Sequence, residues 1–210
     1  MGDLSGTEEA RPAAIADAWR TRLRLYGAAV VLSYALILAG SVWQRHWLID
    51  TDGYAMATDF IAWWSAGRMA MAGQAAAIYD WALHKAVQVA AIGRDFEDFY
   101  GWLNPPHFLL LVTPFALPVY LVGFVLWVLA TAAFMAAMLR LVVPGFVVAA
   151  LMAAPATLWC AAAGQNGFLT AGLMAGCLVL LQGRPWQAGV LLGLLTVKPQ
   201  FGLLFLLFLL

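Results

Sequence analysis

Apolar residues occur in long runs along this chain, and short polar breaks separate most of them. A first run at 25–43 is followed by a mixed segment, 44–106, and then by further runs at 108–117, 119–139, 146–163, 168–181 and 186–197. Runs of around 20 apolar residues match the thickness of membrane hydrocarbon, and a helix satisfies its backbone hydrogen bonds internally. The pattern predicts an all-α polytopic membrane protein.

Composition supports this class. Of the 210 residues, 64% are hydrophobic and 10% are charged, whereas soluble domains carry roughly a quarter charged residues. The formal net charge is zero, which argues against a nucleic-acid partner. Cys160 and Cys177 lie in apolar runs without a neighbouring histidine or carboxylate, so we expect neither a disulfide framework nor a metal site.

Three arginines set the expected orientation of the first run. Arg20, Arg22 and Arg24 stand directly before it, and positive charges hold the adjoining end of a membrane helix in the cytoplasm. We therefore expect a cytoplasmic tail over 1–24, disordered to Ala18, a retained first transmembrane helix over 25–43, and an outer-face loop over 44–106. The predicted location is the cell membrane.

The outer loop is expected to contain short interfacial helices. Segments 57–72 and 76–92 look helical but too mixed to span the bilayer, and Gly73 and Gly93 break them. The acidic stretch 95–98 is expected to be a solvated turn. The loop is rich in aromatic residues, which suit the membrane interface; these are Trp47, Trp63, Trp64, Trp81, Trp102, Tyr54, Tyr79 and Tyr100.

The last part, 107–210, is expected to form a multi-helix transmembrane region. Its first run is too short for a normal span, so it is either a tilted span or a half-helix that does not cross. The second alternative places Arg140 and Arg184 in the cytoplasm, which the positive-inside rule favours. The chain ends within an apolar run, and we expect it to be the N-terminal part of a longer protein.

Asp59 is the candidate catalytic residue. No Asp or Glu follows Asp98, so a catalytic carboxylate must come from the outer loop or the first few residues. Asp59 precedes an aromatic, apolar segment, where partial desolvation would raise its pKa and suit it to act as a base. The alternative is that Thr58 or Asp59 merely caps a helix.

The favoured topology brings four further polar residues to the outer face with Asp59. His107 could bind phosphate or shuttle a proton, or simply face water. Gln165 and Asn166 could hydrogen-bond a sugar, although glycine-flanked amides are also ordinary turn formers. Lys198 is a lone cation where Pro199 predicts a helix break, so it could bind phosphate or extend to the lipid headgroups.

Several short motifs resemble glycosyltransferase family 87. They are, in chain order, Thr58-Asp59-Phe60, Gly73, Ile78-Tyr79-Asp80, Asn104-Pro105-Pro106, Gly164-Gln165-Asn166 and Lys198-Pro199-Gln200. The resemblance implies a C-type glycosyltransferase-like helical bundle, of which the N-terminal half is represented. It also implies a catalytic carboxylate in the first outer loop. Asp59 matches that position, and Asp50 and Asp52 are possible substitutes.

The function implied is hexosyl transfer with inversion, similar to that of polyprenyl-phosphate-mannose-dependent α-mannosyltransferases. The donor would be a polyprenyl-phosphate sugar, the acceptor a glycolipid or glycan, and no cofactor or metal is expected. Mannose is favoured over arabinose or another pentose. Two other classes stay open: a transporter or flippase component, in which the break at Lys198 marks a substrate path, and a non-catalytic membrane assembly subunit.

Overall fold

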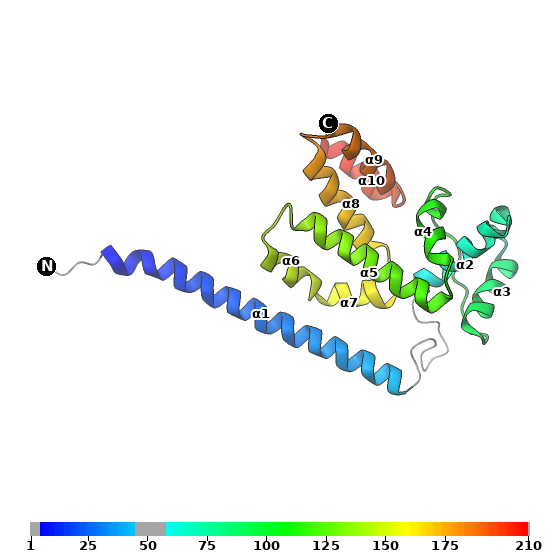
Figure 1. Cartoon of the computed structure of the whole chain (residues 1–210), viewed down its shortest axis with the longest axis horizontal. Coiled ribbons are helices and arrows are strands. Elements are labelled where there is room, and N and C mark those ends of the chain that lie inside the picture. Colours follow the sequence, from blue (N-terminus) through cyan, green and yellow to red (C-terminus); the bar gives the residue numbers. More distant parts are fainter. Residues whose placement is uncertain (1–4, 45–57, 210) are drawn as a thin grey trace.

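The computed structural model describes residues 5–44 and 58–209, and within these residues it contains helices and turns but no strand (Figure 1). This confirms the all-α prediction. The helices are α1 (Ser5–Trp43), α2 (Thr58–Met71), the 3-10 helix η1 (Ala75–Tyr79), α3 (Trp81–Ile92), α4 (Phe108–Ala116), α5 (Tyr120–Leu139), α6 (Gly145–Met152), α7 (Pro155–Ala162), α8 (Gly167–Leu180), α9 (Pro185–Leu195) and α10 (Pro199–Leu209).

The first helix is longer than predicted. It begins at Ser5, so the prediction of disorder up to Ala18 is wrong for the described part of that segment. Its candidate membrane span runs from Asp17 to Ser41. The three arginines therefore lie in the first two turns of this span. Figure 1 shows α1 extending beside α6, and Gly27 approaches Ala153 at their contact.

Helices of spanning length are fewer than the apolar runs suggested. Among the described residues, α1 and α5 are long and apolar enough to cross a membrane, and α6 with α7 could form a third span bent by 58°. The expected crossing over 146–163 is therefore broken in the middle. The runs at 168–181 and 186–197 form α8, with 14 residues, and α9, with 11, which are short for a perpendicular crossing.

The short run before Pro118 forms a short helix that is buried on one face. α4 has nine residues, with Pro114 inside it, and nine residues of α-helix extend only about 14 Å. It packs on α2, where a Cβ added to Gly67 would lie 2.7 Å from Ala116 Cβ. A glycine is needed at this crossing because two helix backbones approach closely. This length favours the half-helix alternative.

α2 is a core helix rather than a helix on the membrane interface. Phe60 is fully buried and Trp63 and Trp64 are 5% and 8% exposed, because α4 and α5 cover them. Trp102 is buried in the same cluster, whereas Tyr79 and Trp81 are exposed. Trp47 and Tyr54 lie outside the described residues. Three of the six described aromatic residues of this set, Trp63, Trp64 and Trp102, therefore serve as packing groups.

The two predicted glycine breaks are confirmed. Gly73 and Gly93 have φ angles of 75° and 83°, in the left-handed region that glycine adopts readily. The helix expected over 76–92 is divided in two, because Asp80 caps α3: its carboxylate accepts from the amides of Ala82 and Leu83 at 3.0 Å. At 95–98 all three acidic side chains are exposed, as expected of a solvated turn.

Two hydrophobic clusters hold the bundle together. The larger joins α2, α4 and α5 around Phe60, Trp63, Phe108 and Trp127, and the smaller joins α8, α9 and α10. α5 packs along α8 and links them (Figure 1). Arg140 ends α5 at the helix end opposite to its contact with α2, so this arginine and the N-terminus of α2 lie at opposite ends of the bundle.

The contact between α4 and α5 leaves no room for a side chain at Gly123. A Cβ there would lie 2.2 Å from the carbonyl oxygen of Phe115, which cannot move without shifting α4. We expect Gly123→Ala to reduce stability by about 1–3 kcal/mol, as overpacking typically does, measured by thermal unfolding in detergent. Gly189→Ala is the control, because its Cβ would meet nothing within 4 Å; an equal loss there would contradict the steric explanation.

Candidate active site

The turn between α7 and α8 positions the start of α2. The carbonyl of Ala163 accepts hydrogen bonds from the amides of Asp59 and Phe60, at 3.1 and 3.4 Å. Gly164 has a φ of 64°, and a Cβ there would lie 2.5 Å from Phe60 Cβ. The first amides of α2 thus have a backbone partner from another segment, and the Asp59 side chain is not needed to cap its own helix.

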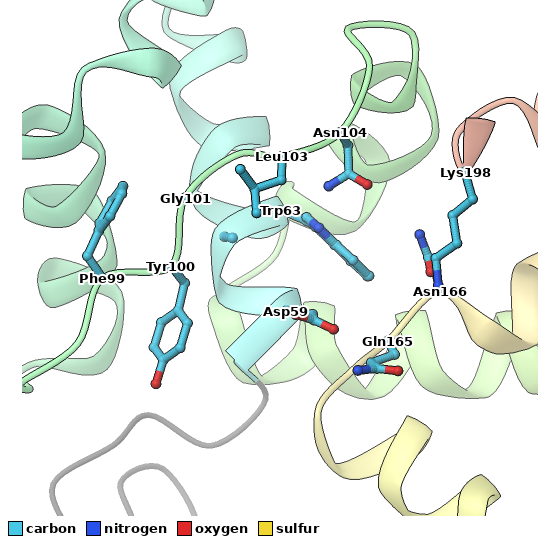
Figure 2. A pocket seen from close by; sticks show the side chains of 11 residues that line it. Asp59, Trp63, Phe99, Tyr100, Gly101, Leu103, Asn104, Gln165, Asn166 and Lys198 are labelled. Atoms are coloured by element: carbon cyan, nitrogen blue, oxygen red, sulfur yellow. The ribbon is translucent and has the colours of Figure 1, made fainter. Parts of the chain in front are cut away.

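Asp59 opens onto a pocket with a volume of about 320 Å³. Figure 2 shows its carboxylate beside Gln165, with Asn166 and Lys198 beyond. The pocket lies among α2, the segment before α4, the α7–α8 turn and the α9–α10 turn. It is lined by Asp59, Ala62, Trp63, Phe99, Tyr100, Gly101, Leu103, Asn104, Gln165, Asn166 and Lys198. Four of the five predicted site residues therefore share one pocket.

Burial raises the pKa of the Asp59 carboxyl above its usual value. Two neighbours oppose this effect: the Gln165 side chain, by hydrogen bonding, and the positive charge of Lys198. Desolvation disfavours a carboxylate, whereas a donor and a nearby cation stabilise it. A half-buried carboxyl with a raised pKa that opens onto a pocket is suited to accept a proton.

Lys198 and Asn166 form the side of the pocket away from Tyr100 (Figure 2). Lys198 lies in the turn between α9 and α10, where the predicted helix break is confirmed, and Pro199 begins α10. Asn166 precedes α8 and is 2% exposed. A cation and an amide on one wall provide donors for a negatively charged group.

His107 lies next to the pocket but does not line it. Its Nε2 atom is 3.3 Å from Thr196 Oγ1, and the Thr196 hydroxyl donates its single hydrogen to the carbonyl of Gly193. The imidazole must therefore donate in the His107–Thr196 contact. This contact joins the start of α4 to the turn that carries Lys198. His107 therefore helps to fix the position of Lys198.

The opposite wall is held in place by α3. Gln88 is fully buried, and its side-chain amide donates to the carbonyl of Tyr100 and accepts from the Tyr100 amide. Lys85 donates to the carbonyls of Phe96 and Asp98 and lies 3.3 Å from the centre of the Phe96 ring. The segment before α4 has no regular secondary structure. The side chains of Lys85 and Gln88 therefore satisfy backbone groups that a helix or a sheet would otherwise pair.

His84 joins α3 to α2 underneath the pocket. It is fully buried, and its Nε2 atom lies 2.7 Å from Ser65 Oγ and 3.1 Å from the carbonyl of Ala62. The Phe99 ring meets the imidazole edge to face. Burial lowers the pKa of His84, against the smaller opposing effect of its hydrogen bond to the Ala62 carbonyl, so folding favours the neutral imidazole. Because Ala62 and Phe99 both line the pocket, His84 supports its floor.

Sequence reasoning missed several lining residues, among them Trp63, Tyr100 and Asn104. Asn104 belongs to the Asn-Pro-Pro motif, and the two aromatic residues were interpreted as interfacial. Asp50 and Asp52, the alternatives to Asp59, lie outside the described residues. In the part of the chain that the structure describes, no three His, Cys, Asp or Glu side chains cluster so that they could hold a metal ion.

Removal of the Lys198 charge should raise the pKa of Asp59 further, because that charge favours the carboxylate. We expect Lys198→Met to move the Asp59 titration to higher pH, measured by infrared difference spectroscopy with Asp59→Asn as the reference. Arg140→Met removes a positive charge at the far end of α5 and should leave the titration in place. An unchanged titration in Lys198→Met would contradict the pocket geometry.

His84 should make stability depend on pH. Below the usual histidine pKa of about 6.5, the unfolded chain binds a proton that the folded His84 resists, so stability falls as pH falls from there towards the lowered value. His84→Leu should be less stable at neutral pH but should lose less on acidification, measured by thermal unfolding. A wild-type slope in His84→Leu would refute this origin.

Comparison with known proteins identifies the family of this chain. Residues 102–210 match the model of glycosyltransferase family 87, a region that contains Asn104, Gln165, Asn166 and Lys198 but not Asp59. No curated protein and no solved structure gives a significant match. The family match covers more than half of the 210 residues, and it confirms the resemblance read from the motifs: this chain belongs to glycosyltransferase family 87.

Proposed function

We propose that this glycosyltransferase transfers mannose from a polyprenyl-phosphate donor to a hydroxyl of a glycolipid or glycan, at the outer face of the cell membrane. Family membership implies sugar transfer. The observation that supports a catalytic role for this pocket is the position of Asp59, whose pKa is raised by burial while Gln165 and Lys198 act on its charge.

Asp59 is the proposed general base. The acceptor hydroxyl gives its proton to the Asp59 carboxylate as its oxygen attacks the anomeric carbon of the donor. The bond from the anomeric carbon to the phosphate oxygen breaks in the same displacement, and polyprenyl phosphate leaves with the bonding electron pair. A single displacement inverts the anomeric configuration.

Lys198 is the proposed partner of the leaving phosphate. An ammonium group aimed at the place where negative charge develops stabilises the transition state more than the ground state. Its turn is braced by His107 through Thr196, so His107 acts on the phosphate through the position of the lysine. Gln165 and Asn166 are proposed to hydrogen-bond the sugar, and the rings of Trp63 and Tyr100 supply apolar surface beside it.

The proposed orientation places the N-terminus in the cytoplasm and the pocket outside. It is supported by charge: Arg20, Arg22 and Arg24 lie near the start of the α1 span, and Arg140 follows α5 at its end away from α2. The positive-inside rule assigns such ends to the cytoplasm. The lipid chain of the donor would lie against apolar helices near the pocket.

Replacement of Asp59 by Asn should abolish transfer while leaving the fold intact. Loss of a general base typically costs a factor of about 10²–10⁴ in rate, and the amides at the start of α2 keep their partner, the Ala163 carbonyl. The measurement is transfer from labelled polyprenyl-phosphate mannose in membranes that contain the protein. In the wild type, the rate should rise with pH through the raised pKa of Asp59, and Asp59→Asn should lack this rise.

Asp80→Asn is the matched control, because Asp80 also begins a helix but does not line the pocket. It should transfer sugar at nearly the wild-type rate. Near-normal activity in Asp59→Asn would refute the assignment of the base. Absence of mannose transfer by the wild type, with transfer from another lipid-linked sugar, would refute the choice of donor and leave the role of Asp59 open to the same comparison.

A further inference from the structure

A second hollow lies between α1 and α6, far from Asp59 along the bundle. Its volume is about 480 Å³, within the range of small-molecule sites. We call it the α1–α6 groove. Two arginines stand in it among apolar and small residues; the lining is Arg20, Leu23, Arg24, Gly27, Ala28, Val31, Phe146, Ala149, Ala150 and Ala153.

We propose that the α1–α6 groove binds an anionic glycerophospholipid, with the phosphate between Arg20 and Arg24 and an acyl chain along the small residues. Basic pockets between membrane helices bind the headgroups of anionic lipids. This site is separate from the candidate active site, and it rests on a different set of residues.

α1 and α6 approach each other at two points along the groove. A Cβ added to Gly27 would lie 3.4 Å from Ala153 Cβ, so α1 and α6 are in contact there. Two turns towards the N-terminus of α1, the Arg20 guanidinium lies over the Phe146 ring at 5.9 Å. Between these two points the groove is lined by Leu23, Arg24 and several glycine and alanine residues. The small side chains leave a channel that a flexible hydrocarbon chain can fill.

The charge of the groove is mostly uncompensated. Asp17 lies 3.4 Å from Arg20 across an exposed pair, and such pairs contribute little. Arg24 forms no ion pair with any described residue. No Asp or Glu follows Asp98 in the sequence, so α6 can supply no carboxylate to either arginine. A phosphate group would complement this charge.

The depth of the arginines also fits a lipid headgroup. The candidate span of α1 runs from Asp17 to Ser41, which places Arg20 and Arg24 in its first two turns. Arginines near the end of a span extend towards the interface where lipid phosphates lie. An acyl chain that starts there would run down the groove towards Val31, in the direction of the hydrocarbon.

The test counts lipids bound to the purified 210-residue chain. The protein is delipidated, incubated with vesicles of phosphatidylcholine that contain a minor fraction of phosphatidylglycerol, extracted and examined by native mass spectrometry. We expect phosphatidylglycerol to be retained in preference to phosphatidylcholine. Arg20→Gln with Arg24→Gln should weaken its retention roughly 10- to 30-fold, from about 1 kcal/mol per arginine.

Arg22→Gln with Arg140→Gln is the matched control, because it removes the same charge from exposed arginines that do not line the groove. It should leave retention within about threefold of the wild type. Ala149→Leu fills the groove at an exposed position without changing charge, and it should also reduce retention.

Equal losses in the two double variants would overturn the proposal, because they would show diffuse attraction to anionic membranes. The proposal would also be overturned if Ala149→Leu and the Arg20 and Arg24 double variant, measured separately, both retained phosphatidylglycerol as the wild type does. So would preferential retention of polyprenyl phosphate over phosphatidylglycerol, or a change of the groove variants from dimer to monomer by light scattering, which would assign the groove to another copy of the chain.

Discussion

The indole of Trp127 donates a hydrogen bond to the Gly164 carbonyl at 2.9 Å, in the centre of the larger cluster. This bond and the Ala163 carbonyl on the first amides of α2 join the α7–α8 turn to both α5 and α2. A buried carbonyl without a partner costs about 1–3 kcal/mol, so the turn is firmly held. These hydrogen bonds also fix the distance between Asp59 and Gln165, because both residues lie within two positions of Ala163, Gly164 or the first amides of α2.

The other wall of the pocket depends on α3 in a different way. Residues 94–107 contain no helix or strand, and buried side chains of α3 satisfy their backbone, chiefly through Lys85 and Gln88. His84 then fixes α3 against α2. The candidate active site is therefore assembled from a rigid helix junction and a loop held by side chains. Loops positioned by a rigid scaffold commonly carry binding and catalytic residues.

The bundle is polar at its two ends in different ways. One end carries the half-buried Asp59 and, across the same pocket, Lys198. The other carries several arginines and, on α6, no carboxylate that could neutralise them. With the proposed lipid-linked donor, this separation would let headgroup attraction at the basic end orient the protein without competing for the donor phosphate at the pocket.

Local sequence determined the helical class and the breaks at Gly73, Gly93 and Pro199, because these depend on apolar run length and backbone conformation. The distribution of acids limited the candidate bases to the segment before α4 and the first few residues, and the family resemblance favoured Asp59 among them. Tertiary structure alone decided that Trp63 and Trp64 pack inside, since an aromatic run suits an interface or a core equally until α4 and α5 cover it. It also decided that His107 stands behind Lys198 and that Asn104 and Tyr100 complete the pocket. Residues so far apart in sequence meet only through helix packing, which no local pattern encodes.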